Sequence, residues 1–238
     1  MSSQEFVFKQ FKILQDKCAM KVGTDAVLLG SWVNASNAEA ILDIGTGTGI
    51  IALMLAQKST AVIDAIDIDK NAFMQAAENA AECRWKNRIN TYHVSLQQYS
   101  SGCSRCYDLI VSNPPYFVDS SKALEESRTN ARHTDQLPFV DLLNGVLNLL
   151  KESGKFYVIL PTKESQQFRE LAEEQKLFLT KLTRVITRTD RPEKRLLMKF
   201  EFNCPKTIDE DCIIIEKDER HSYTDEYKEL TKDYYLGF

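Results

Sequence analysis

Residues 40–49, Ala-Ile-Leu-Asp-Ile-Gly-Thr-Gly-Thr-Gly, decide the fold of this chain. A short apolar run ends there in three alternating glycines, and the helical pattern of Ile50 to Ala56 follows directly. Because glycine adopts positive φ angles and lets a backbone pass close to a ligand, this stretch predicts a strand, a tight turn and a helix. The spacing of its glycines differs from the G-x-G-x-x-G pattern that holds a pyrophosphate, so a dinucleotide is not indicated. Any tight connection from strand to helix also favours glycine, so the loop alone does not identify a ligand.

A second strand with an acidic end follows the glycine loop. Val62 to Ile66 is apolar and runs into Asp67-Ile-Asp69, after which a helix is expected from about Lys70 to Cys83. In α/β sheets an acid at the end of the second strand commonly hydrogen-bonds the ribose hydroxyls of a nucleoside, and Asp67 has that position. Either aspartate could cap the following helix instead, and Asp69 fits that role better than Asp67.

Strand and helix patterns continue to alternate along the chain, which predicts an α/β protein. Two strand-like runs near the C-terminus, separated by a charged turn, predict a hairpin. Thr24 or Asp25 is expected to cap the first helix. The expected strands are a short strand or pair of strands within residues 6–15, then 40–44, 62–66, 91–94, 107–112, 154–161, 179–187, 196–202 and 212–216; the expected helices are 26–32, 50–56, 70–83, 137–150, 165–175 and 223–236.

The stretch Ser112-Asn-Pro-Pro-Tyr116 follows the fourth strand and offers the most chemistry. Asn113 supplies a side-chain amide, and Tyr116 supplies an aromatic face. Each proline fixes its own φ and lacks an N–H, and Pro115 keeps Pro114 out of the helical region, so the carbonyls of this turn stay available as acceptors. These groups suit the binding of a flat, nitrogen-bearing group. The same residues can also form a plain turn at the end of a strand.

Composition indicates an ordinary globular chain. Its 238 residues are enough for one sizeable domain, and no run approaches the roughly 20 apolar residues that span a membrane. The N-terminal residues lack the pattern of a secretory signal, so a cytoplasmic location is expected. The 30 Lys and Arg against 34 Asp and Glu give a net charge of −4, which does not by itself indicate a nucleic-acid partner. Cys103-Ser-Arg-Cys106 has a metal-like spacing, but without a second pair no metal is expected.

A polar segment follows the Asn-Pro-Pro turn. Residues 119–135 lack hydrophobic periodicity and contain Arg128, Arg132 and His133. Such a segment fits a lid or a substrate-contact loop, and it fits a surface loop as well.

Two further charged segments also allow two interpretations. The turn 188–195, together with Arg184, forms a basic strip that suits either phosphate groups or solvent. Lys21 and Asp25 precede a helix, where they could line a ligand pocket or be ordinary surface charges.

The joint spacing of these motifs resembles that of the class I S-adenosylmethionine-dependent methyltransferases. The loop from Asp43 to Gly49 matches the first motif of that class, and Asp67 matches its ribose-binding acid. The resemblance implies a Rossmann-like α/β fold, with a mostly parallel seven-stranded sheet, helices on both faces and a C-terminal antiparallel hairpin, and it implies S-adenosylmethionine as cofactor. The Asn-Pro-Pro-Tyr stretch matches the subgroup that methylates exocyclic or amide nitrogens. There, Asn113 and the Pro114 carbonyl accept hydrogen bonds from the target amino group, while Tyr116 stacks on the target plane.

More specifically, the whole chain resembles the bacterial enzymes that methylate N6 of adenine 37, the nucleotide 3′ to the anticodon of valine tRNA. One departure concerns the adenine amine of the cofactor, which many class members contact with an acid after the third strand, whereas Ser95-Leu96 stands here. Ser95 can still form a hydrogen bond. The residues that carry the resemblance are Lys21-Val-Gly-Thr-Asp25, Asn113-Pro-Pro-Tyr-Phe117, Arg128 with Ala131-Arg-His133, Tyr223-Thr-Asp-Glu-Tyr227 and Tyr234-Tyr-Leu236.

The resemblance implies a division of the chain and a set of site residues. One methyltransferase domain is expected over residues 1–238, with an N-terminal extension (1–35), a cofactor-binding and catalytic core (36–162) and a C-terminal hairpin and helix (163–238). The expected partner is the anticodon stem-loop of tRNA, with no membrane, no stable protein partner and a monomeric chain. The implied catalytic residues are Asn113, Pro114, Pro115 and Tyr116; the implied cofactor-binding residues are Lys21, Asp25, Asp43, Gly45, Thr46, Gly47, Gly49, Asp67, Ile68, Ser95, Leu96 and Asn113; the implied RNA-contacting residues are Phe117, Arg128, Arg132, His133 and Arg195.

Three other functions are compatible with these residues. A protein-glutamine N5 methyltransferase acting on a release factor meets the same planar amide chemistry, although such enzymes usually carry an N-terminal helical domain for which this chain leaves no room. A guanine-N2 methyltransferase of ribosomal RNA is a nearer relative. A non-catalytic RNA-binding module is the alternative outside the enzymes, and the intact glycine loop, Asp67 and Asn113 disfavour it.

Overall fold

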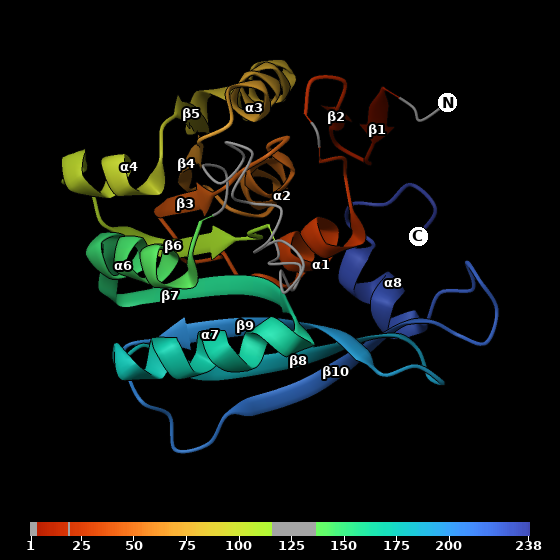
Figure 1. The fold of residues 1–238 in the computed structure, drawn as a ribbon. Helices are drawn as coiled ribbons and strands as arrows, with labels where there is room; N and C mark the ends of the chain where they lie inside the picture. Colours follow the sequence, from red (N-terminus) through yellow and green to blue (C-terminus); the bar gives the residue numbers. More distant parts are fainter. Residues whose placement is uncertain (1–3, 19, 116–136) are drawn as a thin grey trace, which may run out of the picture.

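One large sheet organises the chain, which the computed structural model describes for residues 4–18, 20–115 and 137–238. Over these residues the sheet has eight strands; β9 runs antiparallel to its neighbours β7 and β8, and every other pairing is parallel. Figure 1 shows helices on both faces of this sheet. In spatial order the strands are β10 (Asp209–Glu216), β8 (Phe178–Arg188), β9 (Glu193–Glu201), β7 (Leu150–Pro161), β6 (Tyr107–Ser112), β3 (Ala40–Ile44), β4 (Val62–Asp67) and β5 (Ile89–His93).

Both faces of the sheet are buried, each in its own hydrophobic core. Successive residues of β3 show this division, because Ile41 packs in the core that contains α1 and α2, whereas Leu42 packs in the core that contains α6 and α7. A strand covered on both sides carries apolar residues on both, which explains the nearly unbroken apolar run before the glycine loop. The helices are α1 (Thr24–Trp32), α2 (Ile50–Lys58), α3 (Lys70–Glu82), α4 (Leu96–Gly102), α6 (Phe139–Leu149), α7 (Thr162–Glu174) and α8 (Asp225–Thr231), with a short 3-10 turn η1 (Lys86–Arg88).

The expected fold class is confirmed, and the described part of the sheet has one strand more than the seven expected. The additional strand is β10, which pairs in parallel with β8 and extends the sheet beyond the hairpin. The hairpin itself is confirmed, since β8 and β9 pair antiparallel. A pattern of alternating residues predicts that a strand exists but not which neighbour it joins, so the pairing of β10 was not predictable from its own residues.

Two expected helix features differ in the structure. Gly23 occupies the N-cap position of α1 without a side-chain hydrogen bond, so neither Thr24 nor Asp25 has the expected capping role. At the other end of the chain, α8 ends at Thr231 and does not continue to residue 236. Tyr234 beyond it is buried, and its hydroxyl donates to the Met54 carbonyl at 3.0 Å. Tyr234 therefore contacts α2 from beyond the end of α8.

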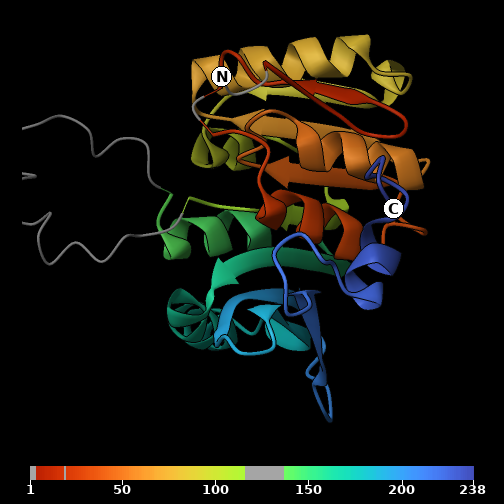
Figure 2. The same ribbon diagram turned by 90° about the vertical axis from the view of Figure 1, so that its right-hand side faces the viewer.

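The N-terminal residues form a small antiparallel pair of strands, one of the two arrangements expected there. β1 (Glu5–Val7) pairs with β2 (Lys12–Leu14), separately from the large sheet. In both views of the ribbon this hairpin lies beside α3 (Figures 1 and 2). Leu14 N donates to Asn79 Oδ1 of α3 at 2.8 Å, so the contact is direct.

No helix in the described part of the chain is both long and apolar enough to cross a bilayer. Nor do the described His, Cys, Asp and Glu side chains form a group of three or more that could hold a metal ion. Cys103 and Cys106 are free thiols.

Candidate active site

A cavity of about 340 Å³ lies where β3, β4, β5 and β6 reach their carboxyl ends. β3 lies between β4 and β6, so the order of the strands changes direction there, and ligands of open α/β sheets bind at such a switch point. Most of the described residues that the sequence predicts for the site meet in this cavity. Those that line it are Gly45, Gly47, Asp67, Ile68, Ser95, Leu96, Asn113, Pro114 and Pro115.

The glycine loop forms one wall of the cavity. Its three glycines have φ angles of 70°, 60° and 82°, the left-handed region that other side chains disfavour. Space for a Cβ is open beside Gly45 and Gly47, which line the cavity. At Gly49, by contrast, a Cβ would lie 3.3 Å from Ala76 Cα, because the loop packs against α3. Close approach of a ligand therefore fits Gly45 and Gly47, whereas Gly49 permits packing.

Asp67 ends β4 beside this loop. Its Oδ2 accepts a hydrogen bond from Gly47 N at 2.8 Å, and its Oδ1 accepts one from Asp69 N at 2.9 Å. Burial raises the pKa of the Asp67 carboxyl, against the effect of these two donors. A carboxylate has further lone pairs, so Asp67 can still accept from the hydroxyls of a ligand. Asp69 caps α3 as expected, since its Oδ1 accepts from Ala72 N at 2.7 Å.

Asp43 and Thr46 support the loop and do not line the cavity. Asp43 is 0% exposed, and its Oδ2 accepts from Thr46 Oγ1 at 2.6 Å. Burial raises the pKa of Asp43 to about 7; the charge of Asp67 adds to this rise, and hydrogen bonds from the Thr46 hydroxyl and the Ala52 backbone oppose it. The first glycine motif thus contains a carboxyl group that is held in the protein interior.

The Asn-Pro-Pro turn begins where β6 ends. Ser112 Oγ donates to the Ile44 carbonyl at 3.0 Å, and the two residues are also paired in the parallel ladder of β6 and β3. Asn113 follows as a half-buried residue and Pro114 as a buried one. Strand pairing therefore places the amide of Asn113 next to the start of the glycine loop.

Ser95 follows β5 and caps α4. Its Oγ accepts from Gln98 N at 3.2 Å and donates to Gln98 Oε1 at 3.2 Å, so the hydroxyl is engaged within its own helix. Leu96 is buried in the cavity wall. Gln97, which sequence reasoning missed, also lines the cavity, and its Nε2 donates to Asp141 Oδ2 at 3.0 Å.

Asp25 and Arg195 form an ion pair outside the cavity lining. Arg195 Nε donates to Asp25 Oδ2 at 2.8 Å, which joins the first turn of α1 to β9. The sequence predicts different ligands for the two residues, the cofactor for Asp25 and RNA for Arg195, and the structure brings the two side chains together. Lys21 is also absent from the lining, although Met20 beside it is present.

Five expected site residues lie outside the described part of the chain, namely Tyr116, Phe117, Arg128, Arg132 and His133.

The lining also contains residues that the sequence did not assign to the site. Ile44 and Ile66 directly precede predicted residues, so the end of a strand was a usable signal for them. Cys18 and Met20 come from the segment after β2, and no local pattern predicts that this segment reaches the cavity. The others are Asp69, Ala72, Val94, Gln97, Ser112 and Leu137.

Comparison with known proteins identifies the family of this chain. The family model described as the methyltransferase small domain matches residues 18–174. A relative from Trichodesmium erythraeum, named tRNA1(Val) (adenine(37)-N6)-methyltransferase, is 46% identical over 241 residues, with 100% of both chains covered. A relative of the same name from Bacteroides thetaiotaomicron is 47% identical over 238 residues, with 99% of both chains covered. The chain belongs to their family.

Membership of this methyltransferase family confirms the resemblance seen in the sequence, with its class I fold and S-adenosylmethionine as cofactor. Solved structures share the fold at low sequence identity. A predicted O-methyltransferase from Agrobacterium tumefaciens has a TM-score of 0.68 at 16% identity, covering 88% of this chain and 96% of its own. Pyrococcus horikoshii TYW2 in complex with MeSAdo has a TM-score of 0.58 at 15% identity, covering 85% and 74%.

Proposed function

We propose that this chain transfers the methyl group of S-adenosylmethionine to N6 of adenine 37 in valine tRNA. One observation carries the proposal: the Asn-Pro-Pro turn lines the same cavity as Gly45, Gly47 and Asp67. Relatives that match along the whole chain are named for this reaction. A nucleoside held by the loop and Asp67 would present its reactive group to the amide of Asn113.

The cofactor belongs at the glycine loop. The open space beside Gly45 and Gly47 lets a ligand approach the backbone, and Asp67 would accept from ribose hydroxyls. Ile68 beside it is 50% exposed and offers an apolar surface to the base. When bound, the cofactor supplies an activated methyl group on a sulfonium. The residues that we assign to direct contact with it line the cavity, namely Gly45, Gly47, Asp67, Ile68, Ser95 and Leu96, with Asn113 at the reacting end. Asp43, Thr46 and Gly49 would act on it through the shape of the loop, and Lys21 and Asp25 lie outside the lining.

The target amine needs positioning more than it needs a base. An exocyclic amine is a poor nucleophile because its lone pair is delocalised into the ring. Asn113 Oδ1 and the Pro114 carbonyl would accept hydrogen bonds from both of its N–H groups, which favours a pyramidal nitrogen whose lone pair points at the methyl group. The nitrogen attacks before it loses a proton, and the proton then leaves to water. No side chain has to act as a general base.

The RNA would be held by the segment after Pro115. Adenine 37 would leave its loop and stack on Tyr116, a contact worth roughly 1–3 kcal/mol per base. The residues that we assign to RNA are Tyr116, Phe117, Arg128, Arg132, His133 and Arg195.

The hairpin turn contributes less positive charge than its sequence indicates. Arg188 and Arg191 both contact Asp190, at 3.3 and 3.6 Å. Arg184 is paired with Glu193 at 3.2 Å and Glu210 at 2.8 Å. Since these charges are neutralised locally, we place the main phosphate contacts in residues 128–133.

The proposal also covers the domain organisation, oligomeric state and cellular location of the chain. We expect one catalytic domain, divided into residues 1–35, 36–162 and 163–238 as above. We also expect a monomer without a stable protein partner, located in the cytoplasm together with its tRNA.

Methyl transfer to defined RNAs tests the proposal. The protein is incubated with labelled S-adenosylmethionine and unmodified valine tRNA, and the RNA is digested to nucleosides. We expect N6-methyladenosine from this tRNA and no transfer to a transcript with guanosine at position 37. Transfer instead to a release-factor glutamine, or to guanine N2 of ribosomal RNA, would overturn the proposal. RNA binding without any transfer would identify a non-catalytic module.

A further inference from the structure

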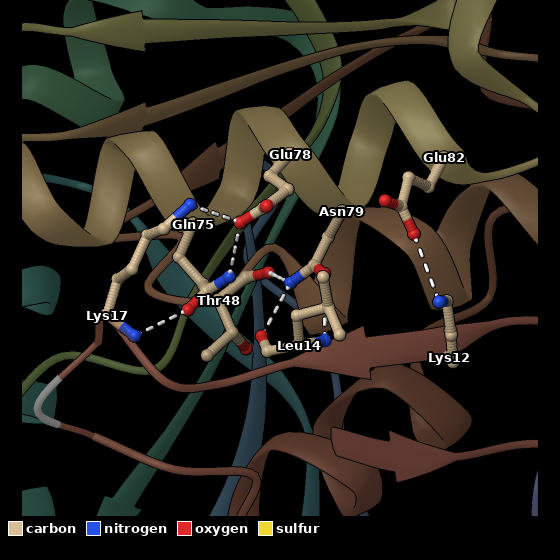
Figure 3. Close-up of polar contacts among 8 residues, drawn as sticks. All are labelled: Lys12, Leu14, Lys17, Thr48, Gln75, Glu78, Asn79 and Glu82. Atoms are coloured by element: carbon tan, nitrogen blue, oxygen red, sulfur yellow. Dashed lines mark hydrogen bonds and ion pairs between the residues drawn. The ribbon is translucent and has the colours of Figure 1, made fainter. Parts of the chain in front are cut away.

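Two buried amides of α3 hydrogen-bond the backbone of the N-terminal segment (Figure 3). Gln75 is 0% exposed and Asn79 is 2% exposed, and they stand four residues apart on one face of the helix. A buried amide is tolerated where its polar atoms are hydrogen-bonded. The partners of both amides include backbone groups of segments far away in the sequence, so these side chains connect parts of the molecule that α3 alone would not join.

Asn79 joins two such segments through a single amide. Its Oδ1 accepts from Leu14 N at 2.8 Å, and its Nδ2 donates to the carbonyls of Leu14 at 2.9 Å and Thr48 at 2.8 Å (Figure 3). Leu14 ends β2, and Thr48 lies near the end of the glycine loop, between Gly47 and Gly49. Both N–H groups and the oxygen of the amide are therefore engaged. One side chain thus sets the end of the N-terminal hairpin relative to the loop.

Gln75 holds the next part of the N-terminal segment. Its Oε1 accepts from Lys17 N at 2.8 Å. Residues 14–18, which we call the strap, are thereby attached to α3 at both ends. The strap leads directly into the cavity wall, because Cys18 and Met20 line the cavity.

α3 also contacts the loop between the two amides. A Cβ on Gly49 would lie 3.3 Å from Ala76 Cα, and one turn earlier Ala72 lines the cavity itself. The small side chains of Ala72 and Ala76 bring α3 close to the glycine loop. Asn79 and Gln75 attach the strap to α3, and Asn79 also bonds the glycine loop. Two walls of the cavity are therefore set by one face of one helix.

A second, exposed row of α3 also contacts the N-terminal segment. Lys17 pairs with Glu78 at 2.6 Å and Lys12 pairs with Glu82 at 3.2 Å, and these four side chains are between 34% and 48% exposed. Exposed ion pairs of this kind contribute little to stability and do not hold the backbone. The outer row of α3 thus provides a matched control for the inner one.

We propose that Asn79, assisted by Gln75, is a positioning residue for the cofactor. It acts through Leu14 and Thr48 and touches no reacting atom. By fixing the glycine loop relative to the strap, it sets the shape of the cavity that Gly47 and Cys18 both line. The inference rests on the proposed function for the identity of that ligand.

The variant Asn79→Asp tests this role with almost no change of shape. Its carboxylate still accepts from Leu14 N, but an oxygen would face the carbonyls of Leu14 and Thr48, where Nδ2 now donates. Binding of S-adenosylhomocysteine is measured by calorimetry well below the unfolding temperature. We expect Kd to rise about tenfold or more, since buried polar groups lose their partners. The KM for tRNA should stay within about twofold, because neither Asn79 nor its partners Leu14 and Thr48 are among the residues that we assign to RNA.

Two further variants make the result decisive. Asn79→Ala removes the amide without repulsion, and it should also weaken binding and accelerate hydrogen exchange of the Leu14 amide in the ligand-free protein. Glu82→Gln removes an exposed contact of the same helix and should leave Kd within about twofold. Unchanged Kd in both Asn79 variants, with faster exchange at Leu14, would overturn the inference while leaving the proposed function intact. A parent chain that binds no S-adenosylhomocysteine would instead overturn the assignment of the cofactor itself.

Discussion

Two cavities of this molecule differ in what surrounds them. The smaller, of about 340 Å³, lies at the carboxyl ends of the parallel strands, between the glycine loop and the Asn-Pro-Pro turn. The larger, of about 490 Å³, lies over β7, β8, β9 and β10 beside α8. Size alone would favour the larger cavity as a ligand site, and the chemistry of the walls favours the smaller one.

Three of the charged residues that line the larger cavity, Lys181, Lys199 and Asp211, are already held in ion pairs. Lys181 contacts Asp209 at 3.0 Å and Asp211 at 3.3 Å, and Lys199 contacts Glu201 at 3.0 Å. A ligand that entered there would have to compete with these ion pairs.

The smaller cavity combines open backbone with a few converging polar groups. Gly45 and Gly47 leave space beside the chain, and Asp67 and Asn113 reach the same volume from two different strands. Small-molecule sites are typically of this kind, mostly apolar with a small number of well-placed polar groups. Polar side chains that reach one cavity from different strands therefore identify the ligand site better than the volume of a cavity does.

The largest expected effect separates the two ends of the smaller cavity. Asn113→Ala should lower methyl transfer on the order of a hundredfold or more, because an acceptor for the target amine is lost, while Kd for S-adenosylhomocysteine changes little. Asp67→Asn should act mainly on binding and raise the Kd for S-adenosylhomocysteine by about tenfold or more, because an acceptor for the ribose hydroxyls is lost. Single-turnover rates and calorimetry on both variants measure this contrast. Equal losses of binding and rate in the two variants would show that the cavity does not divide in this way.

A moderate effect is expected beneath the loop, at Asp43. The pKa of Asp43 is about 7 in the folded chain and 3.8 ordinarily. At a pH between these two values, the folded form therefore holds a proton that the unfolded form has lost. This stabilisation is complete below about pH 4 and is lost as pH rises through about 7. In Asp43→Asn this pH-dependent loss of stability should disappear. The free energy of unfolding of the variant should therefore rise relative to that of the parent by on the order of a few kcal/mol between pH 4 and pH 8. Urea unfolding of both proteins across this range measures the difference, and parallel curves would contradict the buried acid.

The smallest effect is expected in the larger cavity. Lys181→Met and Lys199→Met each remove one partner of an ion pair whose lysine side chain is 30% and 22% exposed, respectively. Methyl transfer should stay within about twofold, and the free energy of unfolding should change by roughly 0–1 kcal/mol. The same transfer assay and thermal unfolding provide the measurement. A large loss of transfer would mean that this cavity also serves the reaction.

Much of the site was predictable because its parts are local. The glycine loop, the cap at Asp69, the acid at Asp67 and the turn at Asn113 each lie within a few residues of a strand end, where turn and capping preferences act on the sequence directly. Parallel strands then bring their carboxyl ends to one edge of the sheet. The expectation that these groups share a cavity is therefore met without any knowledge of distant contacts.

Other parts had no local signal. Asp25 and Arg195 are 170 residues apart and meet as an ion pair. Asn79 reads in the sequence as an ordinary polar residue of a helix, yet it is 2% exposed and holds the backbone of Leu14 and Thr48. The end of α8 at Thr231 likewise depends on where Tyr234 finds a buried partner. Such contacts follow from the placement of whole elements.

Local sequence patterns account for most of the strands and helices in their order, though not for α4, and for the glycine loop and the chemistry of the Asn-Pro-Pro turn, because periodicity and backbone preference act between neighbouring residues. Only the tertiary structure decided that β10 joins β8, that Asp43 supports the loop from within the protein, and that Cys18 and Met20 close the cavity. These outcomes depend on burial and on hydrogen bonds between segments far apart in the chain, which no single stretch of residues specifies.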